Sequence, residues 1–120
     1  MLDTNILSEP LFPTPDHQVL ERLREYNEEV ATASVVWHEL LFGYHRLPPS
    51  ARREAIGRYL EEVVEPSIPI LPYDARAAGW HAAELARLGA VGRTPPLADC
   101  QIAAVARIND LAVVTANTTD

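Results

Sequence analysis

The chain has 120 residues, of which 48% are apolar and 22% are charged. This is a globular composition, with enough apolar side chains for one hydrophobic core. The formal net charge is −7, which argues against non-specific binding to a phosphate backbone. A nuclease is not excluded, because clustered carboxylates that bind divalent cations reverse the local charge. All ten basic residues are Arg, the side chain best suited to bidentate phosphate contact.

No apolar run approaches the length of a membrane span, and the first residues lack the pattern of a signal peptide. A single cysteine, Cys100, excludes an internal disulfide and suits a reducing cytoplasm. We find no repeat, no low-complexity segment and no linker. We therefore predict one domain over residues 1–120, cytoplasmic and without membrane contact.

Apolar periodicity and turn-forming residues predict short strands that alternate with helices. The expected strands lie just before Asp3 and at 29–34, 67–73 and 111–117, and the expected helices lie at 17–27, 35–47, 50–64, 75–89 and 92–109. Ser34, Asp74 and Thr94 are placed to cap three of these helices, and Gly89 is placed to end one. This alternation predicts an α/β fold, in which a parallel sheet has helices on both faces.

In such sheets, functional sites form beyond the carboxyl ends of the strands. Asp3 would lie at the end of the first strand, and Asn117 and Asp120 would lie beyond the last one. Each of these has a simpler interpretation. Asp3 could be the N-cap of a short helix, and Thr115, Asn117 and Asp120 could be ordinary turn residues.

Two further acids lie within expected helices. Asp99 shares a helical face with Ile102 and Ala106, which predicts that it faces the core, and a buried carboxylate needs a partner or a metal. Alternatively, Asp99 is a first-turn acid that suits the helix dipole. Glu39, taken alone, is best interpreted as solvent-facing, although Gly43 leaves its face open one turn later.

Taken together, these acids can converge at one end of a parallel sheet. Carboxylates without His or Cys companions favour Mg²⁺ or Mn²⁺ over Zn²⁺. The four histidines, which have no metal-binding spacing and are expected at the surface, are His17, His38, His45 and His81. Cys100 follows Asp99, but neighbours on a helix point apart, so a cysteine nucleophile is not expected.

Four segments, "LDTNILSEP", "SVVWHELLFG", "PPLADCQIAAVA" and "VVTANTTD", occur here in the order and rough spacing seen in PIN-domain ribonucleases. The chain resembles VapC-type toxins of bacterial toxin–antitoxin pairs, including FitB-like members. The resemblance extends from Leu2 to Asp120. It departs from the pattern at both ends, because family members usually have a longer apolar segment before the first Asp and further residues after the last acid.

The resemblance implies a three-layer α/β/α PIN-like fold with a short central parallel sheet. It also implies an endoribonuclease in which Mg²⁺ or Mn²⁺ activates the water that cleaves RNA phosphodiesters. The implied metal-binding and catalytic residues are Asp3, Glu39, Asp99 and Asp120. Many members have Asp where this chain has Asn117, and we favour Asp120 as the fourth acid. The implied bracing residues are Asn5, Thr115 and Asn117.

The resemblance further implies a homodimer and a small VapB-like antitoxin, whose basic arm would suit an acidic pocket. The helices at 17–27 and 50–64 are candidates for its groove, although core packing explains their apolar stripes equally well. Arg46 and Arg93 are candidate contacts for RNA or antitoxin, with a solvated surface role as the alternative. One alternative function is a catalytically silent PIN-fold module that binds an antitoxin without metal. A receiver-like phosphoacceptor is disfavoured, because it needs a Lys and the chain has none.

Overall fold

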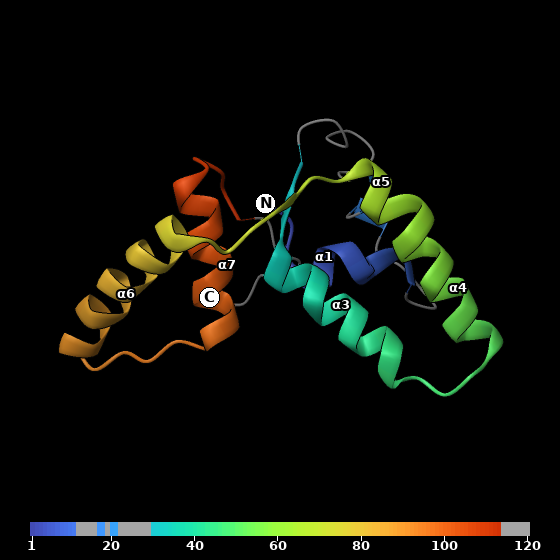
Figure 1. The fold of residues 1–120 in the computed structure, drawn as a ribbon, viewed down its shortest axis with the longest axis horizontal. Coiled ribbons are helices and arrows are strands. Elements are labelled where there is room, and N and C mark those ends of the chain that lie inside the picture. The colour runs from blue at the N-terminus through green and yellow to red at the C-terminus, as the bar shows by residue number, and fades with distance from the viewer. Residues whose placement is uncertain (12–16, 19, 22–29, 114–120) are drawn as a thin grey trace.

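Two short strands lie between two groups of helices in the computed structural model of the chain (Figure 1). The structure describes residues 1–11, 17–18, 20–21 and 30–113. Helices α6 and α7 lie on one side of the strands, and α1, α3, α4 and α5 lie on the other (Figure 1). This is the three-layer α/β/α arrangement that the sequence predicts. No helix in the described ranges is both long enough and apolar enough to cross a membrane.

The elements are short, and most of them are helical. In chain order they are α1 (Thr4–Ser8), the 3-10 turn η1 (Glu9–Leu11), β1 (Thr32–Ala33), α3 (Ser34–Arg46), α4 (Ala51–Tyr59), the π-helical turn η2 (Leu60–Val64), α5 (Glu65–Ser67), β2 (Ile70–Leu71), α6 (Ala75–Ala90) and α7 (Leu97–Ile108). Of the helix expected at 17–27, residues 17, 18, 20 and 21 are helical, and the others lie outside the described residues.

Within the described residues the sheet is parallel and has two strands. β1 pairs with β2, with Thr32 opposite Ile70. Leu2 forms a parallel bridge to Thr32, whose hydroxyl donates to the Leu2 carbonyl at 2.7 Å. The segment before Asp3 therefore lies beside β1, where the first strand was expected. Of the strand expected at 111–117, residues 111–113 are not in a strand, and the others lie outside the described residues.

The predicted helix caps are partly wrong. Asp74 caps α6 as predicted, because its carboxylate accepts from the Ala77 N–H at 3.0 Å. Ser34 does not cap α3: it is the first helical residue, and its hydroxyl accepts from the Tyr73 N–H at 3.2 Å. Thr94 does not cap α7, which begins at Leu97 after Pro96 and has no side-chain cap.

The core forms where the helices meet the strands. Its fully buried large side chains are Leu2, Leu7, Thr32, Val36, Val64 and Val105. Tyr59 ties α4 to α1, since its hydroxyl donates to the Leu7 carbonyl at 2.6 Å. Burial raises the pKa of Tyr59 to about 12, so the phenol stays protonated and remains a donor at neutral pH. These contacts fix α1, which begins directly after Asp3.

Candidate active site

Asp3 lies between the segment paired with β1 and the first turn of α1. Its Oδ1 accepts from the Ile6 N–H at 3.0 Å, so it caps the helix, in agreement with the simpler interpretation of this residue. Within the described residues its Oδ2 accepts no hydrogen bond. The carboxylate is partly buried. The cap bond therefore fixes the orientation of Asp3 and leaves one oxygen available to a ligand.

Glu39 projects from the middle of α3 toward α1. The Thr4 hydroxyl donates to Glu39 Oε2 at 2.8 Å, and Glu39 is partly buried rather than fully solvent-facing. Thr4 directly follows Asp3, so this bond joins the acid of α3 to the residue next to the acid that caps α1. Sequence reasoning missed Thr4. The only signal for it was its place beside Asp3 in the "DTN" triplet.

Asp99 lies in the first turn of α7, which packs against α3 and β1. The prediction that it faces the core is wrong, because Asp99 is exposed whereas Ile102 and Ala106 on the same face are buried. The physical reason is its position: the helix enters the core only after its first turn. Its negative charge near the N-terminus of α7 agrees with the alternative interpretation as a first-turn acid.

The donor set can be compared with what Mg²⁺ or Mn²⁺ requires. Asp3, Glu39 and Asp99 offer only carboxylate oxygens, which these hard cations prefer. Asp3 and Glu39 each keep one oxygen that accepts no hydrogen bond in the described part of the chain. The described residues contain no group of three or more His, Cys, Asp or Glu side chains close enough to hold a metal. The chemistry of the donors fits these cations, and the bond from Thr4 to Glu39 links the segments that carry two of the acids.

A family model decides the identity of the fold. The PIN domain model matches residues 1–119, nearly the whole chain. The chain belongs to the PIN domain family. This confirms the resemblance carried by the four sequence segments.

The curated relatives of this PIN domain include a named toxin and a named ribonuclease. The chain is similar to the toxin FitB of Neisseria gonorrhoeae, with 31% identity over 121 residues that cover 98% of this chain and 87% of FitB. It is also 31% identical to the VapC ribonuclease Y4jK of Sinorhizobium fredii, over 98% of this chain and 86% of the relative.

Two solved structures agree with these relatives. The crystal structure of FitAcB from Neisseria gonorrhoeae superposes with a TM-score of 0.89 at 32% identity, covering 98% of this chain and 86% of that one. The structure of VapBC-5, a member of the VapBC family of toxin–antitoxin systems from Mycobacterium tuberculosis, gives a TM-score of 0.69 at 29% identity, covering 97% and 82%.

The remaining predicted site residues of the PIN domain fall into two groups. Asn5 is exposed on α1, Arg46 is exposed at the end of α3, and Arg93 is exposed in the connection between α6 and α7. The structure assigns no ligand to these three, and their roles stay predictions. The predicted residues that lie outside the described residues are Thr115, Asn117 and Asp120.

The histidines were expected at the surface, and one of them is not there. His17, His38 and His45 are exposed, but His81 is buried in α6. Its Nδ1 lies 2.8 Å from the Tyr73 hydroxyl. Because the Tyr73 N–H in turn donates to Ser34, this chain of contacts links α6 to the start of α3. His81 therefore has a structural role that its sequence neighbourhood did not reveal.

Proposed function

We propose that this PIN domain is a metal-dependent endoribonuclease and the toxin of a type II toxin–antitoxin pair. The observation that carries the proposal is the hydrogen bond from Thr4, the residue after Asp3, to Glu39 on α3, with Asp99 on the helix packed against α3. Membership of the PIN domain family and similarity to a relative named a VapC ribonuclease support it.

In this proposal Asp3, Glu39 and Asp99 hold Mg²⁺ or Mn²⁺, and Asp120 completes the set. Such an ion supplies positive charge that offsets the negative charge developing on a phosphate during in-line displacement. The helix cap fixes Asp3, because the Ile6 N–H occupies one of its oxygens. Thr4 fixes Glu39 in the same way. Carboxylates fixed in this way would hold the ion in place without rearranging during the reaction.

The proposed activity is tested by incubating the purified chain with a labelled single-stranded RNA. Cleavage is expected with Mg²⁺ or Mn²⁺ and is expected to disappear with EDTA. One observation favours the alternative, a silent module that binds an antitoxin without metal: the described residues contain no group of three metal-binding side chains. Antitoxin binding without cleavage in either metal would support that alternative and contradict the proposed activity.

The proposed partner is an antitoxin with a basic segment. A cavity of about 610 Å³ lies between α3 and α4, with Trp37, Leu41 and Leu60 among its apolar lining residues. Three carboxylates, of Glu54, Glu61 and Glu65, line it beside the guanidinium of Arg58, and this excess of negative charge would attract Arg or Lys side chains. The expected groove helix at 50–64 thus borders this cavity. Co-expression with the cognate antitoxin should give a stable complex in size-exclusion chromatography, and two separate peaks would contradict the pairing.

Thr4→Val should weaken the proposed metal site without disturbing the fold. The substitution conserves the shape of the side chain but removes the hydroxyl that orients Glu39. Residues that orient metal ligands typically affect metal affinity by roughly 10- to 100-fold, so we expect Mn²⁺ affinity to fall by about tenfold. Isothermal titration calorimetry measures this change.

Ser8→Ala is the matched control for Thr4→Val. It also removes a hydroxyl from α1, but this hydroxyl donates to the Thr4 carbonyl at 2.7 Å and does not reach Glu39. The control should bind Mn²⁺ as tightly as the unmodified chain. Equal Mn²⁺ affinities for the two variants would show that the bond between Thr4 and Glu39 has no role in metal binding.

A further inference from the structure

The side of α3 that carries His38 presents three stacked planar groups. The rings of His38 and Phe42 are nearly parallel, at an interplanar angle of 13°, with centroids 6.2 Å apart. One turn further on, the guanidinium carbon of Arg46 lies 5.4 Å from the centroid of the Phe42 ring. We call His38, Phe42 and Arg46 the α3 ladder. The eight helical steps from His38 to Arg46 span about 12 Å.

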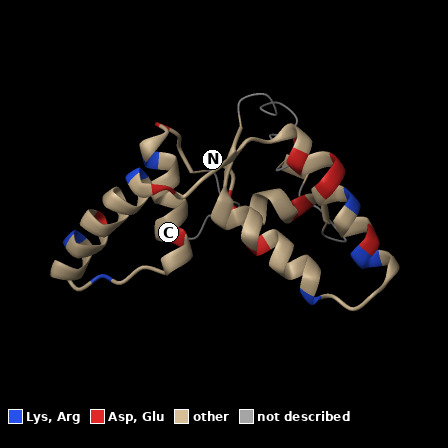
Figure 2. Ribbon diagram, viewed as in Figure 1, with Lys and Arg blue, Asp and Glu red and all other residues tan. Residues whose placement is uncertain are grey.

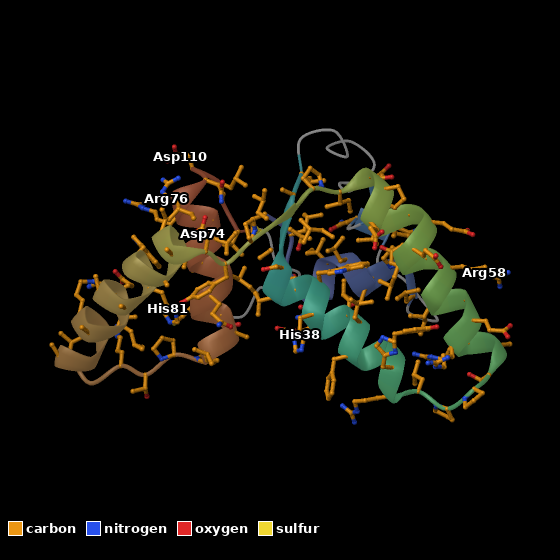
Figure 3. The ribbon with its side chains drawn as sticks, viewed as in Figure 1. His38, Arg58, Asp74, Arg76, His81 and Asp110 are labelled. Carbon is orange, nitrogen blue, oxygen red and sulfur yellow. The ribbon has the colours of Figure 1, made fainter. Side chains whose placement is uncertain are left out.

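The α3 ladder is open to solvent. His38 and Arg46 are exposed, and Phe42 keeps 55% of its surface exposed, an unusual position for a phenyl ring. His38 points away from α4 (Figure 3). The cavity between α3 and α4 is lined by other residues of α3, among them Trp37 and Leu41. The ladder is therefore separate from the proposed antitoxin cavity.

The α3 ladder and the proposed catalytic acid lie on neighbouring faces of the same helix, about 100° apart. Glu39 directly follows His38 in the sequence, and its carboxylate accepts the hydroxyl of Thr4. One turn on from Glu39, Gly43 leaves open space, since a Cβ atom added there would meet nothing within 4 Å. A ligand that extends along α3 from the ladder toward Glu39 would therefore meet no side chain at Gly43.

Positive charge continues from the far end of the α3 ladder. Basic residues mark the end of α3 and the start of α4 (Figure 2). Arg46 and Arg52 are exposed there, whereas Arg53 stacks on Tyr44, which lines the cavity between α3 and α4, with its guanidinium carbon 4.4 Å from the ring centroid. In a chain with a net charge of −7, this local cluster is suited to contact phosphate groups.

We propose that the α3 ladder is a stacking platform for unpaired bases of single-stranded RNA, and this proposal rests on the proposed ribonuclease function. Bases stack on aromatic rings and on Arg guanidinium planes, while basic residues contact the backbone. Every base has a flat face, so the platform would bind unpaired RNA with little sequence preference. Duplex RNA, whose bases are already stacked, would not use it.

The composition of this face favours RNA over a second copy of the chain. A stable protein interface needs a contiguous apolar core, whereas Phe42 is flanked on its face by His38 and Arg46. The other exposed large apolar residues of the described chain are Val63, Leu85, Val91, Leu97 and Val113, and none of them lies on α3. Phe42 is therefore an isolated ring between two polar planar groups.

The test is the binding of a 12-nucleotide single-stranded RNA that carries one 2-aminopurine, measured in EDTA so that no metal is needed. We expect Phe42→Ala to weaken binding by about tenfold, the loss typical of one stacked base. It should also abolish the quenching of 2-aminopurine fluorescence that stacking produces. Phe42→Trp should keep both properties. Arg46→Lys keeps the positive charge but loses the planar guanidinium group. It should weaken both the RNA affinity and the fluorescence quenching.

Val63→Ala is the matched control, because Val63 is an exposed apolar residue in η2, 49% exposed and outside α3. It should bind the RNA as the unmodified chain does. The platform would be overturned if Phe42→Ala bound the single-stranded RNA as tightly as the unmodified chain does. It would also be overturned if the substitution weakened binding of the duplex form of this RNA by the same factor. A change of oligomeric state in Phe42→Ala would also overturn it, since Phe42 would then contact another copy.

The proposed catalytic function can fail independently of the platform. Metal-dependent cleavage combined with Phe42-independent RNA binding would refute only the platform. Phe42-dependent binding of RNA without cleavage in Mg²⁺ or Mn²⁺ would refute only the nuclease.

Discussion

Asp99→Asn is expected to reduce metal-dependent RNA cleavage by at least about 100-fold. In our proposal Asp99 is the ligand contributed by α7, and losing a metal ligand removes several kcal/mol of charge stabilisation, where about 1.4 kcal/mol corresponds to each factor of ten in rate. The fold should persist because Asp99 is exposed. Loss of its charge from the first turn of α7 should lower stability by only about 0.3–1 kcal/mol. Initial cleavage rates and thermal denaturation measure the two effects.

Asp110→Asn is the matched control for this variant. It makes the same chemical change at another exposed acid, just beyond the other end of α7, where Asp110 has a left-handed backbone with φ of 54°. Asn tolerates this conformation. The control should cleave RNA at the unmodified rate. If Asp99→Asn cleaves as fast as Asp110→Asn, Asp99 is simply a first-turn acid and the metal assignment is wrong.

Asp3 is expected to have two roles, which two substitutions separate. Asp3→Asn should retain the helix cap, since Asn caps as well as Asp does, but should lose at least about 100-fold in cleavage because it removes a charged ligand. Asp3→Ala should lose the same activity and also about 1 kcal/mol of stability, because the Ile6 N–H loses its acceptor. Cleavage rates and urea denaturation distinguish the two contributions.

The cap of α6 provides the control for Asp3. Asp74 Oδ1 accepts from the Ala77 N–H at 3.0 Å, the same bond length as in the Asp3 cap. Asp74→Ala should therefore be destabilised by about 1 kcal/mol while RNA cleavage at a temperature well below unfolding stays unchanged. If Asp3→Asn retains full activity, capping α1 is the only role of Asp3.

The sequence predicted the layers of the fold better than its local details. Alternating strand and helix signals identified the segments that became β1, β2 and the long helices, because apolar periodicity follows directly from which side faces the core. The cap predicted at Ser34 was wrong because a tertiary contact competes with the local one. The Ser34 hydroxyl accepts from Tyr73, 39 residues away, and no local rule reports such a partner.

The identities of the candidate site residues could be predicted from the sequence, whereas their burial and contacts could not. The family resemblance identified Asp3, Glu39 and Asp99, because the spacing of motifs along a chain can be read without coordinates. The burial of each acid depended on tertiary structure. Asp99 was placed on a core face by its helical spacing, yet α7 enters the core only after its first turn. The bond from Thr4 to Glu39 joins residues 35 positions apart, so only the fold could reveal it.

Mn²⁺ binding to the chain and to Asp99→Asn, measured by isothermal titration calorimetry, tests the central claim most directly. If Asp3, Glu39 and Asp99 form one metal site, the unmodified chain binds Mn²⁺ and the variant binds it at least about tenfold more weakly, since one charged ligand is missing. Equal affinities in the two proteins, or no binding by the unmodified chain, would contradict the claim that these acids form a metal centre.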